Sequence, residues 1–293
     1  MSKAKIAVIG AGLMGHGIAQ VFALAGHDVT VTDTVLKNLD SLTQRIAANL
    51  RDLGEDEGAV ARVRPCGELA EAVRNVDYVV EAVFEDLTLK QKLFAAIESH
   101  TGVDTILASN TSVIPITSIM AGLKRRERAL GTHWWNPPFL VPLVEVIETQ
   151  WTSPDAVAWT MDLHRAAGKQ PAHVKKDVPG FIGNRLQHAL WREAIARSST
   201  ASVMPKLWMR SSRLHSAAVS PCSARSRMPI WSEPIWRWRS TMSYCRRSTA
   251  GQTHRPICKS LSPTASSGSN RERAFASGAQ NSNRRCVPSS WRI

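Results

Sequence analysis

A glycine-rich turn near the start of the chain is the first sequence feature that could bind a ligand. Its residues Gly10, Gly12, Leu13, Met14 and Gly15 fit the pattern G-x-G-x-x-G. Gly10 allows a tight turn, Gly12 lets a pyrophosphate approach the backbone, and Gly15 allows a helix to pack closely on a strand. The positive end of the following helix would attract the phosphate charge. The turn therefore predicts a dinucleotide site.

A carboxylate follows this turn at the distance that such a site requires. Asp33 ends the apolar segment 29–32 and comes 18 residues after Gly15. A carboxylate at this position accepts a hydrogen bond from a ribose 2′-hydroxyl and repels a 2′-phosphate. Asp33 therefore favours NAD over NADP as the cofactor, although the nearby Lys37 weakens that preference.

An imidazole and a carboxylate stand twelve residues apart in apolar surroundings. His133 ends the segment 129–133, and Glu145 lies within the segment 141–147. A carboxylate buried in such a segment needs a partner, because burying it unpaired is costly. A histidine can take the proton of a hydroxyl group near neutral pH, and a carboxylate can fix its tautomer and stabilise its cation. The pair predicts acid–base chemistry of the kind that accompanies hydride transfer.

These residues need a scaffold that brings strand ends together. Apolar segments expected to be strands occur at 6–9, 29–32, 78–83, 105–108, 129–133, 143–147 and 171–174. Helical patterns occur directly after the glycine turn and at 36–53, 69–73, 89–99 and 154–167. This alternation predicts an α/β protein with a Rossmann-type doubly wound sheet, helices on both faces and ligands at the carboxyl ends of the strands.

A set of motifs occurs in an order that resembles one known family. The motifs lie at residues 10–15, 81–85, 109–112, 133–137, 143–146 and 177–185. Together they make residues 4–196 similar to the L-3-hydroxyacyl-CoA dehydrogenase family, whose members transfer a hydride between a 3-hydroxyl group and NAD.

The resemblance implies a role for individual side chains. His133 would be the general base or acid, and Glu145 would orient it. Ser112 and Asn184 would hydrogen-bond the substrate oxygens. The residues that the resemblance places beside the cofactor are Glu85, Lys90 and Asn110.

The turn after His133 departs from the family pattern. Members acting on short acyl-CoA commonly have two Phe residues and one Pro there, whereas this chain reads Trp134-Trp135-Asn136-Pro137-Pro138. Relatives with a similar run include dehydrogenases of small free hydroxy acids. The substrate is therefore either a 3-hydroxyacyl-CoA or a CoA-free hydroxy acid.

The composition divides the chain into two parts. Residues 1–196 hold 20 basic and 22 acidic side chains, whereas residues 197–293 hold 17 basic and 2 acidic ones. The second part also has 22 Ser and only 11 Leu, Ile, Val and Phe. Such a composition predicts disorder. We expect an NAD-binding domain at 1–178, the first helix of a truncated all-α substrate and dimerisation domain at 179–196, and a basic tail at 197–293.

A shifted reading frame explains the tail. Codons for residues 204–210, read one base earlier, can give Asp-Ala-Glu-Thr-Val-Asp-Ala, a plausible helix entry. The codons for residues 228–234 and 268–277, shifted by one base in the same direction, can also encode segments that resemble the C-terminal part of the family. Our hypothesis is a one-base shift near codons 196–204, which would also impair the family's homodimer.

The sequence also suggests two other functions. The run from Trp236 to Arg239 alternates Trp and Arg, which would suit nucleic acid, but a frameshift explains the tail's composition more simply. The chain could also bind NAD without catalysis. We expect no metal site, membrane span or signal peptide, because Cys spacing and apolar runs of the required kinds are missing. A small-molecule substrate and a cytoplasmic location are expected.

Overall fold

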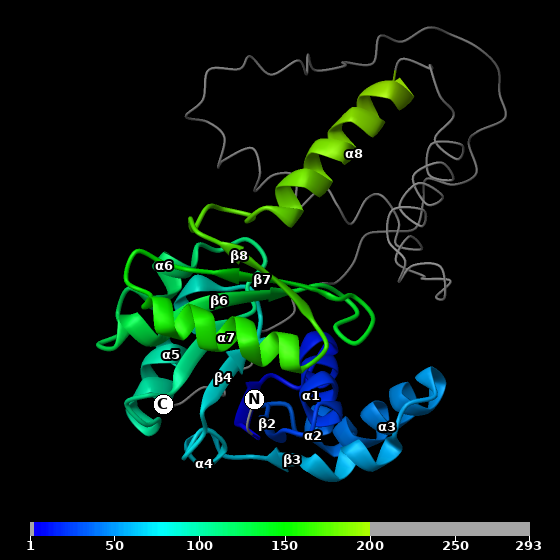
Figure 1. Ribbon diagram of the computed structural model, residues 1–293, viewed down its shortest axis with the longest axis vertical. Coiled ribbons are helices and arrows are strands. Elements are labelled where there is room, and N and C mark those ends of the chain that lie inside the picture. Colours follow the sequence, from blue (N-terminus) through cyan, green and yellow to red (C-terminus); the bar gives the residue numbers. More distant parts are fainter. Residues whose placement is uncertain (1–2, 200–293) are drawn as a thin grey trace, which may run out of the picture. The chain divides into compact units, whose positions relative to one another are not determined.

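One eight-stranded sheet organises residues 3–199, the part that the computed structural model describes (Figure 1). For residues 197–199 only the backbone is described. The strand order is β3-β2-β1-β4-β5-β6-β7-β8. The strands are β1 (Lys5–Ile9), β2 (Asp28–Thr32), β3 (Val63–Cys66), β4 (Tyr78–Glu81), β5 (Ile106–Ser109), β6 (Ala129–Trp134), β7 (Leu143–Ile147) and β8 (Gln170–Val174). All neighbouring pairs are parallel except β6 and β7, so the predicted doubly wound sheet is confirmed.

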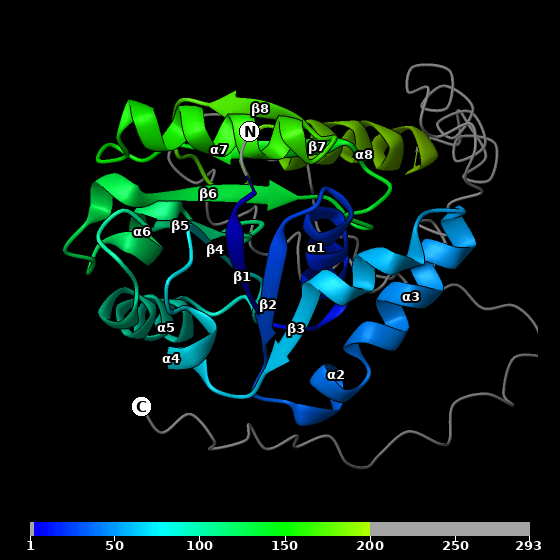
Figure 2. The ribbon, with the colours of Figure 1, turned by 60° about the horizontal axis from the view of Figure 1, so that its bottom comes forward.

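Helices cover both faces of this sheet. The α-helices are α1 (Leu13–Leu24), α2 (Leu36–Asp40), α3 (Leu42–Leu53), α4 (Leu69–Ala72), α5 (Leu87–His100), α6 (Ile116–Met120), α7 (Pro154–Ala166) and α8 (Gly183–Ser199). Two 3₁₀ helices span Glu57–Arg62 and Arg126–Arg128. In Figure 2, α1 and α3 lie on one side of the first strands, and α4 and α5 lie on the other.

Burial on both faces explains why the central strands are continuous apolar runs. In β1, Ile6 and Val8 pack in one hydrophobic cluster with residues of α1, α3 and α7. Ala7 and Ile9 point to a second cluster with residues of α5 and α6. All four are at most 1% exposed. A strand covered on both sides carries no polar alternation, which is typical of parallel sheets between helix layers.

The order of the strands places a switch point at β1. This strand pairs with β2 on one side and β4 on the other. The chain runs outward from β1 through β2 to β3, then returns to β4 and continues in the opposite direction. The backbone amide of Gly10 donates to Thr32 O at 2.7 Å, and that of Ala82 donates to Ile9 O at 2.8 Å. The carboxyl ends of the three strands therefore meet, and this is where open α/β sheets bind ligands.

The structure differs from the predicted elements at the less regular positions. The predicted helix 36–53 is two helices separated at Ser41, whose hydroxyl donates to Lys37 O at 2.9 Å. A serine that bonds the backbone in this way favours a helix end. Strand β3 was not predicted, because it is an edge strand that contains Pro65. The short helix α6 was also not predicted.

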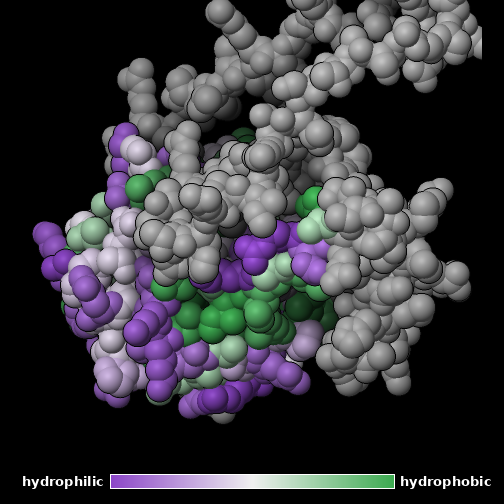
Figure 3. All heavy atoms as spheres, turned by 90° about the horizontal axis from the view of Figure 1, so that it is seen from above, coloured by the Kyte–Doolittle hydropathy of each residue, from purple (hydrophilic) through white to green (hydrophobic). Residues whose placement is uncertain are grey.

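Helix α8 covers most of the segment 179–196, in which the sequence predicts the first helix of the second domain. It leaves three large apolar side chains largely exposed: Leu186, Leu190 and Ile195. Figure 3 shows that hydrophobic side chains also gather on one face of the described part, beside hydrophilic ones. No helix among residues 3–199 is long and apolar enough to cross a membrane. The predicted domain boundaries at 178 and 196 stay predictions, and the predicted all-α domain beyond α8, the tail and the frameshift lie outside the described residues.

Candidate active site

The glycine turn has the shape that a phosphate needs. Gly10 has a φ of +101°, which favours glycine, and an added Cβ would lie 2.6 Å from Ala82 O. An added Cβ on Gly15 would lie 1.7 Å from Gly10 O, so the helix and the turn touch there. At Gly12, by contrast, an added Cβ would meet nothing within 4 Å. The turn is therefore packed on its inner side and open at the residue where we predict the pyrophosphate.

The start of α1 is also suited to an anion. Gly12 is the N-cap and provides no side-chain hydrogen bond, and the first turn holds no acidic residue. The first amides of a helix lack partners inside the helix and carry the positive end of its dipole. Leu13 and Met14 follow, and Leu13 is 66% exposed. These residues fit the phosphates of a dinucleotide.

Asp33 joins the glycine turn to the loop after β2. Its Oδ2 accepts from the Ala11 amide at 2.7 Å and from Asn38 Nδ2 at 3.0 Å, and its Oδ1 accepts from the Val35 amide at 2.8 Å. Arg45 Nη2 donates to the carbonyls of Ala11 and Asn38. The carboxylate that we predict to bind a ribose thus also fixes the position of the turn.

The sheet register brings His133 and Glu145 together. The two residues are directly opposite in the antiparallel pair of β6 and β7, and His133 Nδ1 lies 2.7 Å from Glu145 Oε2. They are 4% and 2% exposed. A carboxylate can only accept, so Nδ1 carries the proton and the lone pair of the neutral ring is on Nε2. The arrangement supplies an oriented base.

Glu145 is held from a second direction by the start of α8. Its Oε1 accepts from the Ile182 amide at 3.0 Å and from the Gly183 amide at 2.9 Å. Burial alone would raise the pKa of the Glu145 carboxyl, but the hydrogen bonds from His133, Gly183 and Ile182 outweigh it and lower the pKa. Glu145 therefore stays a carboxylate at neutral pH and can stabilise a proton on His133.

Ser112 and Asn184 are brought to the same place from distant parts of the chain. Asn184 Nδ2 donates to the carbonyl of Ser112 at 2.8 Å. The Ser112 amide in turn donates to Glu85 Oε1 at 2.9 Å. The two residues predicted to hold substrate oxygens are thus neighbours, and one contact between them is direct.

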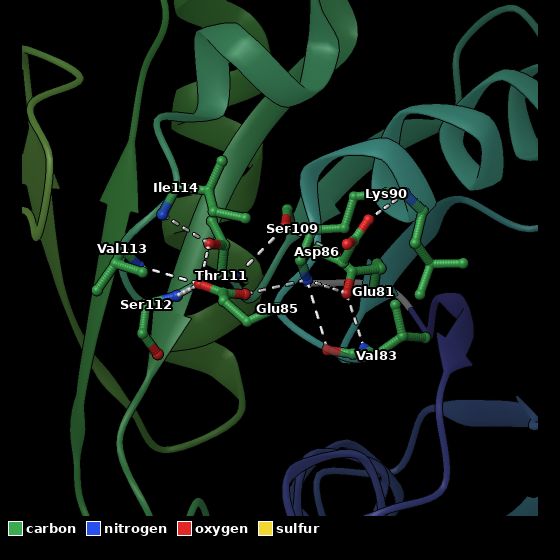
Figure 4. A network of polar contacts seen from close by, with 11 residues as sticks. Glu81, Val83, Glu85, Asp86, Lys90, Ser109, Thr111, Ser112, Val113 and Ile114 are labelled. Carbon is green, nitrogen blue, oxygen red and sulfur yellow. Dashed lines mark hydrogen bonds and ion pairs between the residues drawn. The ribbon is translucent and has the colours of Figure 1, made fainter. Parts of the chain in front are cut away.

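Glu85 and Lys90 belong to a network at the ends of β4 and β5 (Figure 4). Glu85 Oε1 accepts from Thr111 Oγ1 at 2.5 Å and from the Val113 amide at 3.1 Å, so it holds the loop that carries Ser112. Lys90 Nζ lies 3.4 Å from Glu85 Oε2. Burial would raise the pKa of the Glu85 carboxyl, but the charge of Lys90 and the bonds from the loop lower it.

Sequence reasoning missed Glu81, which is the centre of this network. Its Oε1 accepts from Lys90 Nζ at 2.5 Å and its Oε2 from Ser109 Oγ at 2.6 Å. Glu81 and Lys90 are 0% and 1% exposed. A carboxylate inside the apolar segment 78–83 was the signal for this pair, because a buried charge requires a partner.

Asn110 connects two strand ends rather than lying free. The side-chain Oδ1 of Asn110 accepts from the backbone amide of Trp134 at 2.8 Å. The backbone amide of Asn110 donates to Glu81 O at 2.8 Å. The positions of Glu85, Lys90 and Asn110 beside the cofactor stay predictions. Among residues 3–199 no three His, Cys, Asp or Glu side chains are grouped so as to hold a metal ion.

Comparison with known proteins decides the family. The family model "3-hydroxyacyl-CoA dehydrogenase, NAD binding domain" matches residues 5–178. The chain belongs to the 3-hydroxyacyl-CoA dehydrogenase family. NAD is the cofactor of this domain, as Asp33 and the glycine turn predict.

Relatives in this family differ in what they act on. Over 195 residues the chain is 40% identical to the L-carnitine dehydrogenase of Streptomyces griseus, covering 65% of this chain and 58% of the relative. Over 203 residues it is 37% identical to the mitochondrial hydroxyacyl-coenzyme A dehydrogenase of Homo sapiens, covering 65% and 64%. The chain thus spans about three fifths of the length of these curated relatives.

A solved structure has the same fold. The crystal structure of 5-formyl-3-hydroxy-2-methylpyridine 4-carboxylic acid 5-dehydrogenase, an NAD+-dependent dismutase, superposes with a TM-score of 0.69 at 31% identity. The match covers 87% of this chain and 84% of that one.

Proposed function

We propose that this protein is an NAD-dependent dehydrogenase that oxidises the 3-hydroxyl of a 3-hydroxyacyl-CoA or of a related 3-hydroxy acid. The observation that carries the proposal is the buried His133–Glu145 pair, with Nδ1 bound at 2.7 Å and Nε2 left to act as a base. This pair lies in a domain of a family that uses NAD. Histidine paired with a carboxylate suits removal of a hydroxyl proton near neutral pH.

The residues of the site divide the work. NAD+, when bound, supplies the acceptor for the hydride. His133 Nε2 would take the hydroxyl proton, and the Glu145 carboxylate would stabilise the imidazolium that results. Ser112 and Asn184 would hold the substrate oxygens, and the contact between them fixes their separation. Asp33, Gly12 and the first amides of α1 would bind the adenosine and pyrophosphate.

A CoA-free hydroxy acid is the second candidate substrate. The turn after β6 begins with Trp135, whose ring centroid lies 5.2 Å from that of His133. A large aromatic side chain beside the base supports a compact substrate. The relation to L-carnitine dehydrogenase, at 40% identity, supports the same candidate.

One assay tests the proposal and separates the two substrates. The full chain and a frame-restored version are mixed with NAD+ and with 3-hydroxybutyryl-CoA, free 3-hydroxybutyrate or L-carnitine, and NADH formation is followed by absorbance. We expect NADH with at least one of the three. Turnover of the thioester alone would favour the acyl-CoA, and turnover of a free acid alone would favour the second candidate. NAD+ binding without NADH from any of them in either version would contradict the proposal.

A further inference from the structure

Gly183 leaves space that a neighbouring tryptophan fills. A Cβ added to Gly183 would lie 2.3 Å from Trp135 Cζ2 and 3.2 Å from Trp135 Cη2. Carbon atoms that are not bonded do not approach to 2.3 Å, and the outer edge of a packed indole cannot move without displacing its neighbours. Gly183 does not have a positive φ, so glycine is needed here for space and not for backbone conformation.

The indole that fills this space lies against the candidate base. The rings of Trp135 and His133 have centroids 5.2 Å apart and planes inclined by 54°. Phe181, two residues before Gly183, contacts the same imidazole with a centroid distance of 5.5 Å. The orientation of the His133 ring is therefore set by packing from the turn after β6 and from the segment that leads into α8, in addition to its bond with Glu145.

The backbone at Gly183 also reaches the carboxylate that orients the base. Its amide donates to Glu145 Oε1 at 2.9 Å, next to the Ile182 amide at 3.0 Å. An added Cβ would lie 3.3 Å from Glu145 Oε2, the oxygen bound to His133. A side chain at position 183 would therefore push the start of α8 away from both Trp135 and Glu145.

We propose that Trp135 and Gly183 are a complementary pair of positioning residues, in which the missing side chain at 183 lets the start of α8 clamp Glu145 while the indole fixes the His133 ring. The inference rests on the proposed function, because it concerns proton transfer at His133. Neither residue needs to touch the reacting atoms. The pair acts by keeping the imidazole and the carboxylate in one geometry, and small displacements of a catalytic group can be costly.

A double-mutant cycle tests the pair on the full-length chain. Gly183→Ala places a methyl group against the indole and is expected to lower kcat about 10- to 100-fold without a matching change in KM for NAD+. Trp135→Phe removes the outer edge of the ring, so the double variant Trp135→Phe/Gly183→Ala is expected to recover activity relative to Gly183→Ala. Gly122→Ala is the matched control, because an added Cβ at Gly122 meets nothing within 4 Å.

A second readout does not depend on activity. NMR titration of the Glu145 carboxyl reports the loss of its amide donors, so its pKa should rise in Gly183→Ala and fall back in the double variant. If Gly183→Ala does not fold, recovery of folding by Trp135→Phe supports the pair in the same way. Additive effects of the two substitutions, or a Gly183→Ala variant like the wild type in both readouts, would overturn it. If the wild type makes no NADH, the proposed function fails. The NMR titration of Glu145 in the variants still tests whether Trp135 and Gly183 act together.

Discussion

Two buried histidines show how differently the strand ends and the core of this protein treat the same side chain. His133 lies at the end of β6 with Nδ1 on the Glu145 carboxylate. His164 lies in α7, is 0% exposed, and donates from Nδ1 to Thr160 O at 2.7 Å. Its Nε2 has no partner among the described residues. Its ring contacts the rings of Phe22, Tyr78 and Trp134.

The comparison shows that a buried histidine needs a suitable partner, and not burial alone, to act as a base. Burial in the aromatic cluster lowers the pKa of His164 to about 4, because a second N–H would find no acceptor there, and the bond to Thr160 does not compensate. His133 is almost as buried but has an ionised carboxylate beside it. The core therefore keeps its histidine neutral, whereas the strand ends provide a group that can stabilise a protonated one.

Replacing the strand-end histidine should give the largest effect. His133→Gln removes the base but can still bond to Glu145, so kcat should fall about 10²- to 10⁴-fold while NAD+ affinity is unchanged. Steady-state kinetics and NAD+ titration measure the two quantities. His100→Gln, at an exposed position, is the control. Near-normal turnover by His133→Gln would remove the distinction between the two histidines.

The strand-end region is itself held by a buried ion pair, and breaking this pair should give the next largest effect. Glu81→Gln removes the nearer and fully buried carboxylate partner of Lys90, which is 1% exposed, and leaves only the half-buried Glu85 at 3.4 Å. Removing one partner of such a pair costs about 3–5 kcal/mol of unfolding free energy. Urea unfolding measures this loss. Glu81→Gln/Lys90→Met should lose less than Glu81→Gln alone; an equal or larger loss would mean that the charges are not coupled.

Lowering the pH should reduce the unfolding free energy through His164, the core histidine. The pKa of His164 is about 4 in the folded protein and 6.5 as a model value, so the unfolded state binds a proton first as pH falls. This residue should therefore remove about 3 kcal/mol of unfolding free energy between pH 7.5 and 4. Urea unfolding of the wild type and of His164→Met over this range isolates the effect. A pH dependence identical in both proteins would show that His164 is not kept neutral.

Replacing Glu145, the carboxylate that contacts His133, should have the smallest effect of the four changes. Glu145→Gln keeps the shape but loses the charge, so kcat should fall about 10- to 100-fold. The folded pKa of Glu145 is below 4.5, so its contribution to stability is present above pH 4.5 and is lost as pH falls through the folded pKa. Urea unfolding of Glu145→Gln should thus approach the wild type in acid. A constant difference at all pH values would argue against this charge.

The regular parts of the fold were predictable because periodic burial leaves a mark in the sequence. The strands at 6–9 and 143–147 are buried on both faces and, apart from Glu145, apolar, and they were found within a residue. The edge strand β3 was not, since Pro65 and an exposed Arg64 hide its pattern. At the site, a carboxylate within the apolar segment 141–147 suggested that Glu145 pairs with His133, and the antiparallel register produces the pair.

Contacts between distant segments were beyond sequence reasoning. Nothing local to Gly183 indicates that Trp135 will occupy the place of its side chain, because the contact depends on how α8 approaches the sheet. The bonds that Asp33 accepts from the Ala11 amide and from Asn38 Nδ2 depend likewise on how the glycine turn packs. Glu81 could have been found, since its charge in an apolar strand required a partner such as Lys90.

The bonds of Asp33 have a consequence for how the cofactor is received. The carboxylate already fixes the glycine turn and the loop after β2, and Arg45 donates to the carbonyl of Ala11 in the turn and to that of Asn38 in α2. The adenosine end of the dinucleotide would therefore meet loops that lose little conformational entropy on binding. Folding, rather than the arrival of NAD, would then do most of the ordering of the two loops that Asp33 joins.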